Sequence, residues 1–127
     1  MRWEPVRDTP RLHETPLATI RVDMPRISVE ADDEHEERIR LVFETYQAMR
    51  VITSDCFEIP DGLSFSPPWQ IYECIDSVWV RELKETLRRG NSTADFMDKA
   101  RHFLIPLQDD FVEVVAWDLR HEPVRKD

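Results

Sequence analysis

The side chains with the clearest chemical potential are two cysteines and one histidine. Cys56 and Cys74 fall in two apolar segments that we expect to form paired strands, and His102 falls in a third. An imidazole beside a thiol can activate it as a nucleophile, so a catalytic pair is geometrically conceivable. Both cysteines, however, have apolar neighbours, and a cysteine in such a setting is usually a small buried hydrophobe. We therefore predict a structural role for both thiols and keep catalysis as the alternative.

Glu113 is a carboxylate within an otherwise apolar segment, residues 111–119. A charged group there must pair with a basic side chain or lie beside a cleft, because burying an unpaired charge is costly. Arg101 and His102 on the preceding segment could supply the partner. We predict a local ion pair or a strand-end position that reaches solvent, and an acid–base role is the alternative.

We expect neither a metal site nor a bound cofactor. The four histidines do not stand at metal-ligand spacing. His35 and Glu36 begin like the helix of a zinc protease, but Ile39 occupies the position of the second ligand. The two glycines lie far apart in the chain, so no glycine-rich loop can cradle a phosphate group.

Two segments could instead bind another protein. Acidic side chains crowd residues 30–37, and the segment 60–69 combines aromatic residues, which are enriched at interface hot spots, with stiffening prolines. The alternatives are a solvated acidic helix start and a loop that folds back over the core. The candidate binding residues are Asp33, Glu36, Glu37, Phe65 and Trp69.

The charge balance narrows the classes of partner. The net charge is −9, and most of the acidic excess lies after the first thirty residues. Such a body repels phosphate backbones, so we expect no nucleic-acid partner, whereas a basic protein would be steered towards it. No apolar run is long enough to span a bilayer. With two cysteines and no hydrophobic signal region near the start, we expect a cytoplasmic protein with reduced thiols.

The C-terminal segments predict a β-hairpin. Residues 111–119 are mostly apolar on both faces, as a central strand buried on two sides requires. Residues 102–107 contain Pro106, which cannot donate to a ladder and therefore favours the outer position. Residues 108–110 supply the turn.

Two helices are expected upstream of this hairpin. The first covers residues 33–49, with Asp33 as N-cap and Glu36 completing a capping box. Its apolar side chains recur at the spacing of one helical face: Ile39, Val42, Phe43, Tyr46 and Met49. The second covers about residues 77–89 and ends before Gly90, a residue suited to a helix C-terminus.

The remaining strands are expected in pairs. Residues 17–24 and 26–30 read as a short edge hairpin, and residues 51–59 and 70–75 as a second pair with β-branched and aromatic content. Residues 1–16 carry three prolines and no periodicity, which is typical of an extended arm.

Together these elements predict an α+β fold: an antiparallel sheet of four to six strands with two main helices packed on one face, a C-terminal β-hairpin and an extended proline-rich N-terminal arm. We expect residues 17–127 to form one domain. The favoured function is a small acidic protein-binding module, of the inhibitor or immunity type, that masks a basic surface of a partner. The alternatives are a structural homo-oligomer that pairs through its N-terminal arm, and a small enzyme or ligand-binding domain with a pocket between sheet and helices.

Overall fold

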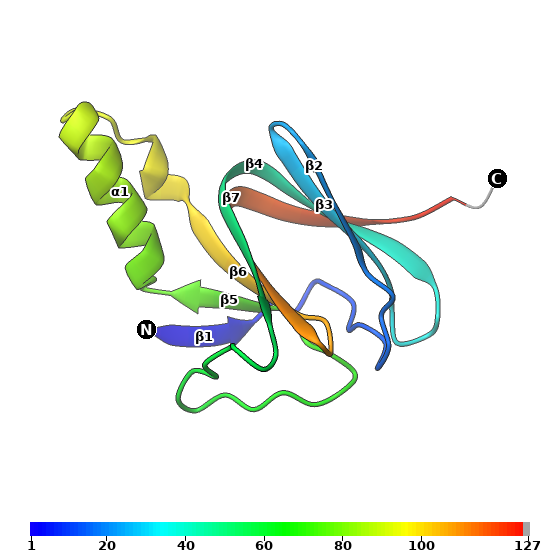
Figure 1. The fold of residues 1–127 in the computed structure, drawn as a ribbon. Helices are drawn as coiled ribbons and strands as arrows, with labels where there is room; N and C mark the ends of the chain where they lie inside the picture. The colour runs from blue at the N-terminus through cyan, green and yellow to red at the C-terminus, as the bar shows by residue number, and fades with distance from the viewer. Residues whose placement is uncertain (126–127) are drawn as a thin grey trace.

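A seven-stranded antiparallel sheet forms most of the molecule (Figure 1). The computed structural model describes residues 1–125. The strands follow one another across the sheet in the order β1-β5-β6-β7-β4-β3-β2. The elements in chain order are β1 (Arg2–Pro5), β2 (Thr19–Asp23), β3 (Arg26–Asp32), β4 (Arg38–Thr53), β5 (Tyr72–Ile75), α1 (Val78–Gly90), the 3-10 turn η1 (Phe96–Lys99), β6 (Arg101–Pro106) and β7 (Asp110–Pro123).

The predicted C-terminal hairpin is confirmed, and its second arm lies at the centre of the sheet. β7 pairs with β6 on one side and with the long strand β4 on the other. Its residues Phe111 to Ala116 are all buried, as a strand covered on both faces must be. The expected outer position of β6 is wrong, because β6 lies between β5 and β7. Pro106 is tolerated because it is the last residue of that strand.

The main core lies on one face of the sheet. Alternate residues of the central strands supply it, because successive side chains of a strand point to opposite faces. Leu12, Ile71 and Leu107 close it from the connecting segments. The strand residues of this core are Ile27, Val29, Ala31, Ile39, Leu41, Phe43, Phe103, Ile105, Val112, Val114 and Ala116.

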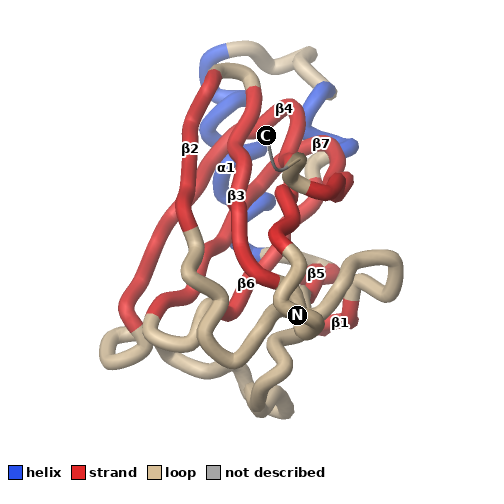
Figure 2. Tube along the Cα trace, turned by 90° about the vertical axis from the view of Figure 1, so that its right-hand side faces the viewer, coloured by secondary structure: helices blue, strands red, loops and turns tan. Residues whose placement is uncertain are grey.

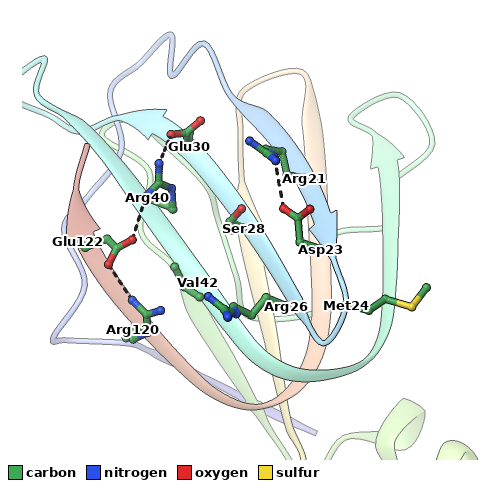
Figure 3. Close-up of a pocket in the computed structure, with 10 residues that line it drawn as sticks. All are labelled: Arg21, Asp23, Met24, Arg26, Ser28, Glu30, Arg40, Val42, Arg120 and Glu122. Atoms are coloured by element: carbon green, nitrogen blue, oxygen red, sulfur yellow. Dashed lines mark hydrogen bonds and ion pairs between the residues drawn. The ribbon is translucent and has the colours of Figure 1, made fainter. Parts of the chain in front are cut away.

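The opposite face is divided between a helix and solvent. Figure 1 shows α1 beside β5 and β6, at the far end of the sheet from β2 and β3. Over β2, β3, β4 and the end of β7 this face is open and carries paired charges (Figure 3). Arg40 binds Glu30 and Glu122, each at 2.9 Å, and Arg120 binds Glu122 at 2.8 Å and Glu44 at 3.1 Å. The charged side chains of this open face therefore largely satisfy one another.

The predicted α+β arrangement with two main helices is wrong, because the segment expected to form the first helix is the long strand β4. The residues that suggested a helical face also fit a strand: Ile39 and Phe43 are buried in the core, while Arg40 and Val42 line the opposite face. Thirteen residues of β4 pair with β7, and this pairing overrides the local helical signal. A bulge between Tyr46 and Ala48 shifts the register of the strand, which also blurs its alternation.

The expected capping box is the turn between β3 and β4. The Asp33 carboxylate accepts the backbone N–H groups of His35 and Glu37 at 2.8 and 2.9 Å. Glu36 adopts the left-handed region, with φ of 63°. Asp side chains form such local bonds in turns as readily as at helix starts, which explains why the same pattern misled the prediction.

The predicted strand at residues 51–59 is also wrong beyond Thr53, where β4 ends. Its expected pairing with residues 70–75 does not occur, because the end of β4 pairs with β7 while β5 pairs with β1 and β6. Two other expected elements are confirmed: β2 and β3 form an edge hairpin, and α1 begins after its N-cap Ser77.

The first sixteen residues are packed against the rest of the fold. β1 pairs with β5, and Leu12 is fully buried and exchanges two 2.8 Å backbone hydrogen bonds with Trp69. Within residues 1–125, no helix has the length and apolar character that crossing a membrane would need.

Candidate functional site

Three buried polar side chains form a relay between the sheet and the start of α1. Glu113 on β7 and His102 on β6 lie on the face opposite the main core, and Ser77 is the N-cap of α1. The Nε2 atom of His102 lies 2.7 Å from Oε1 of Glu113, and its Nδ1 atom lies 2.8 Å from Oγ of Ser77. The three residues are only 2 to 7% exposed. The prediction that Glu113 pairs with a neighbouring base is thus confirmed, with His102 as one partner.

Arg50 from β4 completes the neutralisation of Glu113. Its Nε and Nη2 atoms donate to the two carboxylate oxygens at 2.6 and 3.2 Å. The guanidinium also stacks over the Trp79 ring, 4.1 Å from the ring centre. Trp79 and Trp3 both contact the His102 ring edge-to-face, with ring centres 5.2 and 5.3 Å apart. The imidazole therefore lies between two indoles.

These contacts determine the charge state of the carboxylate. Burial raises the pKa of Glu113, but hydrogen bonds from His102 and Arg50 outweigh burial, so its pKa lies below the ordinary value. An ionised carboxylate only accepts hydrogen bonds, so Nε2 of His102 must donate to it. When the imidazole is neutral, Nδ1 then accepts a hydrogen bond from the Ser77 hydroxyl group.

A serine, a histidine and an acid in this order are the parts of a nucleophilic relay. Ser77 and His102 border an open hollow of about 470 Å³, together with Cys74 and Arg81. Two contacts nevertheless favour a structural role. The Ser77 hydroxyl oxygen already accepts the backbone N–H of Val80 at 3.1 Å as a helix cap, and two indoles enclose the imidazole.

The relay therefore serves to anchor α1. This helix contains no fully buried residue of its own; Trp79, Leu83 and Leu87 form a half-buried stripe, and Trp79 contacts His102 and Arg50 of the sheet. A helix with so little buried surface depends on the polar bonds at its first turn, which join it to β6 and β7 through Ser77 and His102.

The two cysteines lie in different settings. Cys74 is buried on β5 directly opposite His102 on β6, and burial raises the pKa of its thiol to about 11. Cys56 is exposed in the segment after β4, which is contrary to its expected place in a buried strand. A protonated thiol is a poor nucleophile, so Cys74 lacks the activation that a catalytic role needs. No group of three or more possible metal ligands occurs among the described residues.

The two segments that the sequence predicts as binding surfaces, residues 30–37 and 60–69, meet at the end of the sheet away from the start of α1. The Glu34 N–H donates to the carbonyl of Arg11 at 2.9 Å, which joins the β3–β4 turn to the N-terminal segment. The Trp69 indole N–H donates to the carbonyl of Glu14 at 3.1 Å, which joins the loop before β5 to the same segment. Three stretches that are distant in sequence thus meet in one place.

A shallow groove of about 340 Å³ opens between them, lined by His13, Glu14, Glu34, Pro67 and Pro68. Residues 34–37 are all exposed, and so is Glu14. We call the exposed carboxylates Glu14, Glu34, Glu36 and Glu37 the acidic rim. Its nearest basic group is His13, whose Nε2 lies 3.5 Å from the Glu36 carboxylate.

The predicted binding residues fall into two groups. Glu36 and Glu37 belong to the exposed rim, whereas the Asp33 side chain is bound within the turn. Phe65 and Trp69 are half-buried: Phe65 packs against Phe57, Tyr72 and Phe111, and Trp69 packs against the core. Neither aromatic side chain lines this groove, and both border a neighbouring hollow instead.

Sequence reasoning did not identify Glu14, Arg50 or the site role of Ser77. Ser77 lies at the expected start of the second helix, where either Asp76 or Ser77 could cap it, and the use of one hydroxyl for both cap and relay has no local signal. Arg50 fell between the helix expected at residues 33–49 and the strand expected at residues 51–59, so it was not placed beside Glu113 in the sheet. Glu14 stands in a segment without periodicity.

Comparison of the chain with protein-family models, with curated proteins and with solved structures found no match.

Proposed function

We propose that this chain is a small protein-binding module whose acidic rim masks a basic surface of a partner protein, in the manner of an inhibitor or immunity protein. The observation that carries the proposal is the convergence of three segments into one groove bordered by exposed carboxylates. A surface assembled from separate segments and held by backbone bonds is preorganised, which lowers the entropic cost of binding.

The electrostatics of the whole chain support a basic partner. The net charge of −9 creates a negative field that speeds encounter with positively charged surfaces. On the open sheet face the carboxylates are bound by arginines, whereas the four carboxylates of the rim lie beside two histidines, with His13 3.5 Å from Glu36 and His35 3.9 Å from Glu34. The rim is therefore one place where exposed carboxylates gather without an arginine or lysine partner among the described residues.

The groove also gives the acidic rim a defined shape. Pro67 and Pro68 are exposed and conformationally stiff, and the half-buried Trp69 fixes the end of their loop. The buried relay at the other end of the sheet belongs to the scaffold in this account, because its donors and acceptors already serve the packing of α1.

Affinity capture from native lysate, at low and high salt, tests the proposal with two matched variants. The rim variant Glu34→Lys/Glu36→Lys/Glu37→Lys should lose a basic partner that the unchanged protein retains at low salt and releases at high salt. The control carries lysine at Glu82 and Glu85, which are exposed on α1, and should retain the partner. Equal capture by the rim variant and the unchanged protein would reject the proposed surface.

A further inference from the structure

The strand β2 forms one outer edge of the sheet, and no described element lies beyond it (Figure 2). The two-residue turn Met24–Pro25 makes Asp23 and Arg26 a hydrogen-bonded pair. Because such pairs alternate along an antiparallel ladder, the N–H and C=O groups of Ile20 and Val22 point away from β3. These main-chain groups are available to a further strand.

Exposed apolar side chains lie in β2 and on both sides of it. Leu17, Val22 and Met24 are 67, 46 and 83% exposed, and they account for three of the eight large apolar residues exposed in the described chain. Ile20 is half-buried against the core on the same face as Val22. An exposed sheet edge is normally blocked by charged side chains, by proline or by a covering element.

The two charges on β2 have opposite signs, so they do not repel an identical strand that pairs with β2 in antiparallel register. Arg21 and Asp23 lie on the charged face, two residues apart and both 65% exposed, and within one copy they form an ion pair of 3.4 Å that can exchange partners with a second copy (Figure 3). In an antiparallel pair of identical strands centred on Val22, Arg21 of each copy stands opposite Asp23 of the other. Opposite charges at facing positions of adjacent strands attract each other.

We infer that β2 is a pairing edge whose occupant is β2 of a second copy of this chain, in antiparallel register about Val22. The two Val22 residues exchange main-chain hydrogen bonds, and Arg21 and Asp23 form two symmetric ion pairs. The apolar residues of both edges meet on the core face, so the two sheets continue as one. A two-fold interface of this kind uses the same surface of both copies.

This inference is independent of the proposed partner surface, because β2 and the acidic rim are different elements. Sedimentation equilibrium over a concentration series tests it. The mass of the unchanged protein should rise towards that of a dimer. Asp23→Arg and Arg21→Asp each place like charges opposite each other in the two-fold pair, so each should weaken dimerisation by roughly tenfold or more.

An equimolar mixture of the two variants should restore dimerisation, because arginines of one copy then face aspartates of the other. The control Glu85→Arg makes the same change of charge as Asp23→Arg on the exposed face of α1 and should dimerise like the unchanged protein. The inference is overturned by an unchanged protein that stays monomeric at every concentration. It is equally overturned if the Asp23→Arg variant dimerises as strongly as the unchanged protein. It is also overturned if the mixture of the two variants dimerises no more strongly than each variant alone.

Discussion

Replacing Glu113 by glutamine tests the role of the buried relay in holding α1 on the sheet. The substitution keeps the size of the side chain, so it opens no cavity, but it removes the negative charge that His102 and Arg50 share. Both bonds are charge-assisted, and an amide replaces one acceptor oxygen with a donor group that faces other donors.

The expected loss follows from the burial of the three groups. The Glu113 and His102 side chains are 5 and 2% exposed, whereas Arg50 is 45% exposed and can recover hydration. Breaking a buried pair costs about 3–5 kcal/mol, and the partial exposure of Arg50 places this variant near the lower end, at about 3 kcal/mol. Urea unfolding followed by tryptophan fluorescence measures it, since Trp3 and Trp79 both contact His102.

The loss should also depend on pH in a stated direction. The pKa of Glu113 in the folded protein lies below its ordinary value of 4.5, so its ionised form is stabilised by folding. This contribution is fully present above that ordinary value and disappears as the pH falls through the folded pKa. The difference between the unchanged protein and Glu113→Gln should therefore be constant near neutral pH and shrink below about pH 4.5.

A control substitution shows how the stability loss at the relay compares with the loss at an ordinary surface ion pair. Glu30→Gln removes a carboxylate that is bound by Arg40 on the open face of the sheet, and should cost less than about 1 kcal/mol. A Glu113→Gln loss as small as that of Glu30→Gln, or a loss that does not change with pH, would refute the reasoning.

Three further outcomes follow from the packing. Leu12→Ala should cost about 2–5 kcal/mol in urea unfolding, because this fully buried side chain ties the N-terminal segment to the core. Iodoacetamide near pH 8 should modify Cys56 and leave Cys74 unmodified in the folded protein, as peptide mass spectrometry would show, since Cys56 is exposed while burial raises the pKa of Cys74 to about 11. Ser77→Ala should cost about 1–3 kcal/mol in thermal unfolding, because it removes the helix cap and leaves a buried nitrogen of His102 without its partner; an unchanged melting temperature would contradict the anchor.

The hairpin of β6 and β7 could be predicted because its signals are local. Residues 111–116 are apolar without interruption except at Glu113, and such a run identifies a strand covered on both faces. The same apolar surroundings indicated that Glu113 needs a partner. His102 lies on the other arm of the same hairpin, so it could be predicted as that partner.

The strand β4 could not be predicted from its own residues. Its apolar side chains satisfy a helical period and an alternating one at the same time, and the acidic turn before it imitates a helix start. The pairing of β4 with β7 decides between the two structures, and the paired residues lie between 57 and 84 positions apart in the chain. Arg50 was lost from the predicted site for this reason.

Cross-linking at the groove tests the proposed function most directly. A photoreactive residue at Ser66, which is exposed beside Pro67, should yield an adduct with a basic protein in native lysate. The same adduct should disappear in the Glu34→Lys/Glu36→Lys/Glu37→Lys background, and a photoreactive residue at Glu85 on α1 should not form it. No adduct at Ser66, or an adduct that forms equally at Glu85, would contradict the account.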